Sequence, residues 1–192
     1  MTMPLDPVTY LQQDFGSFAA LINAHGVNQP ERVALRDEDH ELTWSETAAL
    51  VNRIAAQLQA EGLQRGQAVS ILGTTTVQYA LVYLAAIVAG GCAAPLTTSA
   101  TPTQLAAMMA DSGASHLFID STKRAELLAS PAELPLLKHI MLDQAVQDVP
   151  SMQDWMAAEG VSAAVCEPDK TDPFNIIYSS GTTGTTKGIV HS

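Results

Sequence analysis

The chain has 192 residues, of which 47% are apolar, so it can form one domain with a sizeable core and is not a largely disordered chain. Its formal net charge is −11, from 20 acidic and 9 basic side chains, and such a surface repels nucleic-acid backbones and anionic membranes. Both are therefore excluded as partners. A nucleotide phosphate is still compatible, because a local loop can oppose the overall sign.

Cysteine usage and the N-terminal residues indicate the compartment. The two cysteines lack a Cys-x-x-Cys spacing, which argues against a disulfide framework and favours the reducing cytoplasm. No basic region followed by an apolar run begins the chain, so no secretory signal is expected. The five histidines are scattered without metal-ligand spacing, and we predict no metal site.

The N-terminal residues predict a helical arm. Asp6 followed by Pro7 is typical of a helix start, and this helix is expected to run to about Asn23 and to end at Gly26. Residues 1–30 are assigned to the arm.

A hairpin and a capped helix follow the arm. Strands are predicted at 33–36 and 41–43, and the acidic turn between them is interpreted as a solvent-facing tip rather than a metal site. Thr43 and Glu46 have the spacing of a capping box, and they open an amphipathic helix that Gly62 closes.

One long stretch, residues 66–110, contains no charged side chain, and its segment 80–89 is almost entirely apolar. A membrane span needs about 20 such residues, and this run is interrupted by the two glycines that follow it. We therefore predict a helix that is buried on several sides and no membrane span.

Helix and strand patterns alternate through the rest of the chain. The strands predicted at Cys92, His116 and His139 begin about 24 residues apart, the span of a strand and a crossover helix. The fold class is therefore α/β, with a layered, largely parallel, helix-flanked sheet. Pro95 predicts a short or peripheral strand. The predicted elements are strands at 69–72, 92–96, 116–120, 139–142 and 174–178, helices at 76–89, from 101, at 121–129 and at 151–159, an acidic linker at 161–172, and a further strand beginning at Ile189.

Ten consecutive residues after the strand at 174–178 are all glycine, serine, threonine or lysine. Open backbone N–H groups, several hydroxyls and one positive charge are the groups that hold a polyphosphate. The strand would deliver this loop to a sheet edge, where ligands collect in α/β folds. We predict phosphate binding by Ser179, Ser180, Gly181, Thr182, Thr183, Gly184, Thr185, Thr186, Lys187 and Gly188.

Three other interpretations of the loop fit less well. A Walker A loop needs a lysine directly after glycine, whereas Lys187 follows Thr186. The dinucleotide-binding turn needs Gly-x-Gly-x-x-Gly and a following helix, and neither is found here. A plain flexible linker is compatible with the composition, but the apolar strands on both sides favour a functional loop.

The stretch from Tyr178 to Gly188 resembles the signature loop of the AMP-forming adenylating enzymes. This superfamily includes the acyl- and aryl-CoA synthetases, the adenylation domains of peptide synthetases and the luciferases. Nearly the whole chain takes part in the resemblance, because further segments occur in the order that the family uses, at 31–35, 42–46, 68–71, 87–91 and 95–96.

The chain departs from the family pattern in two ways. Thr186 stands where the family usually has proline, which predicts a more mobile loop. In the family, the residues that contact adenine, ribose, magnesium and the acid, and the adenylation lysine of the C-terminal lid domain, all lie downstream of this loop. The resemblance therefore implies that residues 31–192 are an incomplete N-terminal α/β domain, that no catalytic residue lies within it, and that the fragment is inactive alone.

The resemblance implies an acid–thiol ligase as the parent enzyme. A carboxylic acid would react with ATP, as its Mg²⁺ complex, to give acyl-adenylate and pyrophosphate, and CoA would then displace AMP. The loop would clasp the β- and γ-phosphates. His191 is a candidate neighbour of the acyl site, although a strand-edge histidine is the simpler interpretation.

Several alternatives stay open at this level. The absence of aspartate after Pro95 favours an acyl-CoA ligase, with a role such as fatty acid metabolism, over an adenylation domain that loads a carrier protein. A stand-alone nucleotide- or phosphate-binding module and a scaffold with an inert loop are the other candidates. We also expect self-association through surfaces that the missing part of a longer enzyme would cover.

Overall fold

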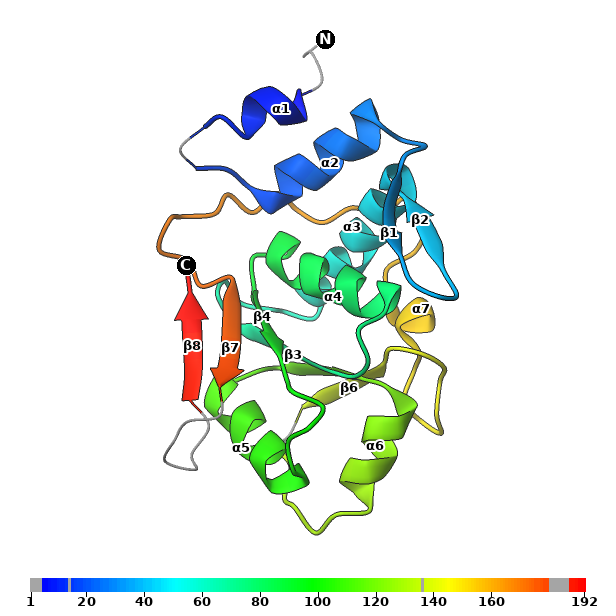
Figure 1. Ribbon diagram of the computed structural model, residues 1–192, viewed down its shortest axis with the longest axis vertical. Coiled ribbons are helices and arrows are strands. Elements are labelled where there is room, and N and C mark those ends of the chain that lie inside the picture. Colours follow the sequence, from blue (N-terminus) through cyan, green and yellow to red (C-terminus); the bar gives the residue numbers. More distant parts are fainter. Residues whose placement is uncertain (1–4, 14, 136, 180–186) are drawn as a thin grey trace.

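A six-stranded sheet forms the centre of the computed structural model, which describes residues 5–13, 15–135, 137–179 and 187–192 (Figure 1). The strand order is β6-β5-β3-β4-β7-β8. The first five of these strands run parallel, and β8 is antiparallel to β7. The predicted α/β class with a largely parallel sheet is confirmed. The strands are β3 (Ala68–Leu72), β4 (Cys92–Pro95), β5 (His116–Ile119), β6 (Lys138–Met141), β7 (Asn175–Ser179) and β8 (Lys187–His191).

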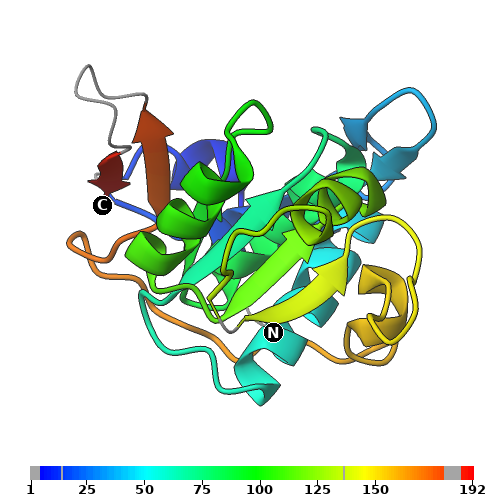
Figure 2. The ribbon, with the colours of Figure 1, turned by 90° about the horizontal axis from the view of Figure 1, so that it is seen from below.

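Helices cover both faces of the sheet because successive strand residues point to opposite sides. The first face is covered by α3 (Trp44–Ala60) and α4 (Val77–Val88), on which α2 (Phe18–Asn28) packs from outside, and the second face by α5 (Pro102–Ser112) and α6 (Ser121–Leu128). In β3, Val69 and Ile71 belong to the core under the first set of helices. Leu72 belongs to the other core, under α5 and α6, and Figure 2 shows these two helices on the viewer's side of the sheet.

The N-terminal arm differs from its prediction. It contains two helices, α1 (Pro7–Tyr10) and α2, because Ser17 starts a new helix by accepting the Ala20 amide. Gly26 lies inside α2 and does not end it. A β-carbon at Gly26 would stand 2.9 Å from Ala48 Cβ of α3, so the glycine permits close packing of two helices.

Local signals located the other helices well. Both capping boxes form, at Thr43 and at Thr101, and each threonine side chain accepts the amide three residues later. The predicted hairpin is present as β1 (Val33–Arg36) and β2 (Glu41–Thr43). The helix predicted at 151–159 is only the single turn α7 (Met152–Trp155).

The strand predicted to be short or peripheral because of Pro95 is short and not peripheral. The strand that contains Pro95 is short, but it lies inside the sheet between β3 and β7. Pro95 is its last residue, where the missing amide costs the sheet little.

The apolar helix predicted between layers is α4, which packs on both α3 and the sheet. Within the described residues, every helix is too short or too polar to cross a membrane.

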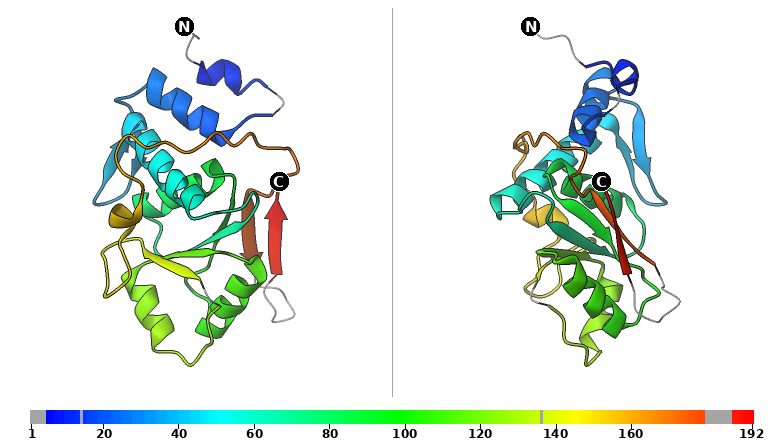
Figure 3. Two further views of the ribbon diagram at one scale, coloured as in Figure 1. Left: turned by 180° about the vertical axis from the view of Figure 1, so that it is seen from behind. Right: turned by 90° about the vertical axis from the view of Figure 1, so that its left-hand side faces the viewer.

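The predicted acidic linker returns the chain from one edge of the sheet to the other, passing between α2 and α4 (Figures 1 and 3). Side chains of α3 fix its course. Gln59 bonds both the amide and the carbonyl of Ala164, and Arg53 donates to the Ala157 carbonyl at 2.7 Å. This strap delivers β7 next to β4, where the Ala93 amide donates to the Phe174 carbonyl at 2.9 Å.

Candidate functional site

The predicted phosphate loop is bracketed by the β7–β8 hairpin at one edge of the sheet (Figure 2). Ser179 and Lys187 form the last cross-strand pair, and both side chains are exposed. The structure thus brings the first and last parts of the loop side by side at the carboxyl end of β7. The central residues lie outside the described residues, namely Ser180, Gly181, Thr182, Thr183, Gly184, Thr185 and Thr186.

The end of the hairpin next to the loop contacts α5. The Tyr178 hydroxyl lies 2.9 Å from the Met108 carbonyl oxygen and 3.0 Å from Asp111 Oδ2, and its one proton can be donated to either acceptor. Across the hairpin, Gly188 is paired with Tyr178. The sequence analysis overlooked Asp111, because nothing in the local pattern of α5 distinguishes this exposed aspartate from any other.

His191 ends β8 and is exposed. Its backbone carbonyl accepts the Phe174 amide at 3.0 Å, and its ring lies 6.4 Å from the Phe174 ring between centroids. The residue therefore lies at the amino end of β7, at the opposite end of the hairpin from Ser179 and Lys187.

A polar cleft of about 790 Å³ opens at the carboxyl ends of the parallel strands and is lined by several aspartates. Asp37 accepts the Val77 amide at 2.8 Å, and this bond, with further hydrogen bonds to its own turn, lowers the pKa of Asp37 to about 2 in spite of some desolvation. Asp120 likewise accepts the Thr74 amide at 2.9 Å. The acidic turn of the hairpin is thus a cap for α4 as well as a solvent-facing tip.

These carboxylates occupy the backbone amides that could otherwise bind an anion. A phosphate entering this cleft would meet the side chains of Asp37 and Asp120 at the amides that the fold offers, and the charge of Asp37, whose pKa is lowered, would repel it. Among the described residues, no three His, Cys, Asp or Glu side chains are arranged to hold a metal ion. The hairpin end, with Lys187, is the more suitable place for a polyphosphate.

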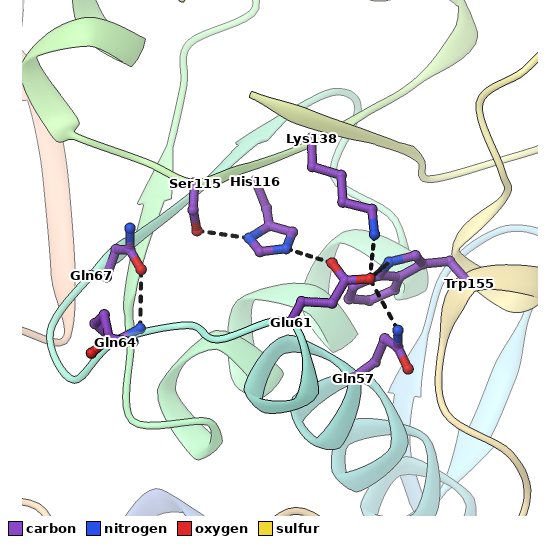
Figure 4. Close-up of polar contacts among 8 residues, drawn as sticks. All are labelled: Gln57, Glu61, Gln64, Gln67, Ser115, His116, Lys138 and Trp155. Carbon is purple, nitrogen blue, oxygen red and sulfur yellow. Dashed lines mark hydrogen bonds and ion pairs between the residues drawn. The ribbon is translucent and has the colours of Figure 1, made fainter. Parts of the chain in front are cut away.

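Figure 4 shows a second polar cluster, at the amino ends of β5 and β6. The loop instead follows the carboxyl end of β7. The centre of the cluster is Glu61, which follows α3. His116 Nε2 lies 2.8 Å from Glu61 Oε2, and Trp155 Nε1 donates to Glu61 Oε1 at 2.9 Å. Lys138 and Gln57 also donate to Glu61 Oε1.

Hydrogen bonds lower the pKa of the Glu61 carboxyl group more than desolvation raises it. Desolvation alone would raise the pKa of Glu61, but the bonds from Lys138, His116, Gln57 and Trp155 together lower it from 4.5 to about 2. The cluster joins α3, β5, β6 and α7. Each donor is therefore already engaged within the fold, and the cluster serves stability rather than ligand binding.

Comparison with known proteins decides the family. Residues 22–192 match the model of the AMP-binding enzyme family, which is most of the chain. This chain belongs to the AMP-binding enzyme family. The resemblance found in the signature loop is thereby confirmed.

Curated relatives of this family fall into two groups. The chain is 29% identical to long-chain-fatty-acid–CoA ligase FadD13 of Mycobacterium tuberculosis over 80% of its length, and it covers 30% of that protein. It is 32% identical to the hybrid PKS-NRPS synthetase pynA of Aspergillus niger over 95% of its length, covering 4% of that protein. The chain thus spans less than a third of each of these relatives.

Solved structures share the fold. The anthranilate CoA ligase AuaEII, in complex with anthranoyl-AMP, matches 98% of this chain with a TM-score of 0.83 at 20% identity, and 36% of that chain is covered. The N-terminal domain of FACL13 from Mycobacterium tuberculosis matches 92% with a TM-score of 0.78 at 22% identity, and 44% of it is covered. The fold is that of the N-terminal domain of adenylating enzymes.

Proposed function

We propose that this chain is the first part of the large domain of an AMP-forming acid–thiol ligase. The observation that carries the proposal is the hairpin that brings Ser179 and Lys187 together at the ends of a glycine- and threonine-rich loop, in a chain of the AMP-binding family. Residues 1–30 would form a helical arm and residues 31–192 an incomplete α/β domain.

The loop would bind the β- and γ-phosphates of ATP, with all ten residues from Ser179 to Gly188 contributing. Backbone amides and hydroxyl groups would donate to the phosphate oxygens, and Lys187 would supply a point charge. The net charge of −11 and the carboxylates of the cleft supply repulsion elsewhere, which would confine the polyphosphate to this loop.

The first reaction would join a carboxylate oxygen to the α-phosphorus of ATP. The bond between the α-phosphorus and the bridging oxygen to the β-phosphorus breaks, and pyrophosphate leaves with that electron pair. The phosphates that the loop holds are the ones that leave. Little covalent chemistry is required of the protein in such transfers, so positioning and charge stabilisation would be its contribution. Magnesium would arrive as the ATP complex.

The second reaction would transfer the acyl group from AMP to a thiol. CoA is our first choice, because FadD13 and AuaEII are CoA ligases and because Leu96, not aspartate, follows Pro95. A carrier-protein thiol is the second candidate, favoured by the 32% identity to a hybrid PKS-NRPS synthetase.

The natural protein that contains these 192 residues provides the test. We expect pyrophosphate exchange into ATP that depends on an added carboxylic acid, assayed over a panel of aliphatic, aromatic and amino acids. Addition of CoA should then yield an acyl-CoA. Exchange without thioester formation would favour the carrier-protein alternative, and no acid-dependent exchange over a broad panel would contradict the proposal.

A further inference from the structure

Tyr178 directly precedes the phosphate-binding loop, and its side chain joins the hairpin to a distant helix. The hydroxyl reaches two acceptors on α5, the Met108 carbonyl oxygen at 2.9 Å and Asp111 Oδ2 at 3.0 Å. Helix α5 is far from Tyr178 in the sequence, but in space it lies against the hairpin (Figure 1). One side chain thus connects two elements that the backbone ladder leaves separate.

Gly188 of β8, which is paired with Tyr178, also lies close to α5. A β-carbon at Gly188 would stand 3.1 Å from Tyr178 Cε1 and 3.2 Å from Asp111 Oδ2. It would also meet Ile176 Cγ2 at 3.0 Å. Since the tyrosine ring and the aspartate leave no comfortable room for a side chain there, both strands of the hairpin fit α5 closely.

The phenol of Tyr178 has a raised pKa, so it stays protonated and can act as a hydrogen-bond donor. Partial burial, and next the Asp111 carboxylate, raise the pKa of Tyr178. The phenol therefore keeps its proton at neutral pH, and this single proton is shared between the two acceptors. A bond to an ionised acceptor is roughly twice as strong as one between neutral groups.

We propose that Tyr178 and Asp111 are positioning residues for nucleotide binding, which fix the hairpin on α5 so that Ser179 and Lys187 face the phosphates in one geometry. This inference rests on the proposed function. The backbone ladder holds the loop end of the hairpin only weakly, because β8 lies at the edge of the sheet and β7 joins β4 through the single pair of Ala93 with Asn175, at the other end of β7. Without the anchor, ATP would have to order the hairpin as well as bind to it, and affinity would fall.

The first test compares ATP–pyrophosphate exchange kinetics of the natural protein with those of its variants. We expect Tyr178→Phe to raise the KM for ATP roughly fivefold to tenfold, which corresponds to one lost hydrogen bond. The KM for the carboxylic acid should stay unchanged. Asp111→Ala should raise the KM for ATP less than Tyr178→Phe does, because the Met108 carbonyl oxygen still accepts from the phenol. Asp111→Asn should lie between wild type and Asp111→Ala, because its neutral amide oxygen still accepts but more weakly than a carboxylate.

Tyr83→Phe is the matched control. Tyr83 belongs to α4 and packs against the core on the other face of the sheet, so the loss of its hydroxyl should leave the KM for ATP unchanged. An unchanged KM for ATP in Tyr178→Phe would overturn the inference. An equal rise in both KM values would also overturn it, because such a rise indicates general damage to the fold.

A second measurement separates this inference from the proposed function. Amide hydrogen exchange of residues 187–190, measured without nucleotide, should be several-fold faster in Tyr178→Phe than in wild type. If wild type lacks acid-dependent pyrophosphate exchange, the proposed function fails while this measurement still tests the anchor. Equal exchange of these amides in the two proteins would contradict the anchor, whatever the enzyme assay gives.

Discussion

The Glu61 carboxylate, with a side-chain exposure of 17%, accepts hydrogen bonds from donors on three other elements, and its partner His116 is only 4% exposed. A buried charge that lost one of these donors would be left poorly compensated, which costs several kcal/mol in proteins. At the scale of single residues, this cluster (Figure 4) stabilises the amino ends of β5 and β6.

The stability of the fold should depend on the ionisation of Glu61. Its pKa is 4.5 in the unfolded chain and about 2 in the folded state, so the unfolded chain takes up the proton first as the pH falls. The stabilisation is complete above pH 4.5 and disappears as the pH falls toward 2. Between pH 7 and pH 3, wild type should lose about 2 kcal/mol more unfolding free energy than Glu61→Gln.

Urea unfolding at the two pH values measures this difference. Glu126→Gln is the control, since Glu126 is 54% exposed and forms a surface pair with Lys123. That variant should follow wild type closely. Equal acid sensitivity of wild type and Glu61→Gln would contradict the role assigned to the cluster.

At the scale of elements, features that depend on residues close in the sequence could be predicted, and features that depend on contacts between distant residues could not. Capping boxes at Thr43 and Thr101 depend on residues three apart, so the sequence shows them directly. The order of the strands depends on tertiary packing, and nothing in the sequence indicated that β3 lies between β4 and β5. Gly26 looked like a helix end, but a contact with α3 explains it.

The same division applies to the candidate site. The predicted loop stands out from composition alone, because nine small or hydroxylated residues and one lysine are consecutive. The anchor beneath it could not be found, since Tyr178 and Asp111 are 67 residues apart and only the packing of α5 on the hairpin brings them together.

The packing of α2 on α3 provides a test of this scale. Gly26→Ala should lower the unfolding free energy by about 1–2 kcal/mol, because the overlap with Ala48 outweighs the gain in helix propensity. Val27→Ala, at a position that is 65% exposed in the same helix, should change stability little. Thermal or urea unfolding of the two variants measures the difference, and a stabilised Gly26→Ala would be inconsistent with close packing.

At the scale of the whole molecule, β8 leaves one edge of the sheet without a neighbour in the described part of the structure. Its Ile189 and Val190 are 50% and 59% exposed, and Ile177 of β7 is 45% exposed. Unprotected edge strands with apolar side chains pair readily with other chains. We therefore propose that the 192-residue chain self-associates through this edge.

Light scattering over a range of concentrations tests this proposal. Ile189→Lys should reduce association, because a lysine on an edge strand opposes pairing. Val165→Lys introduces the same charge on the strap, at a position 86% exposed, and should leave association unchanged. A wild-type chain that stays monomeric at high concentration would be evidence against an adhesive edge.

The central claim is that the loop binds the two outer phosphates of ATP, and Lys187→Ala in the natural protein tests it most directly. Isothermal titration with ATP and with AMP distinguishes these phosphates from the rest of the nucleotide, and Lys170→Ala on the strap serves as the control. Loss of one charged donor should weaken ATP binding at least about tenfold and leave AMP binding within about twofold. Equal weakening of ATP and AMP, or no change for either, would contradict the claim.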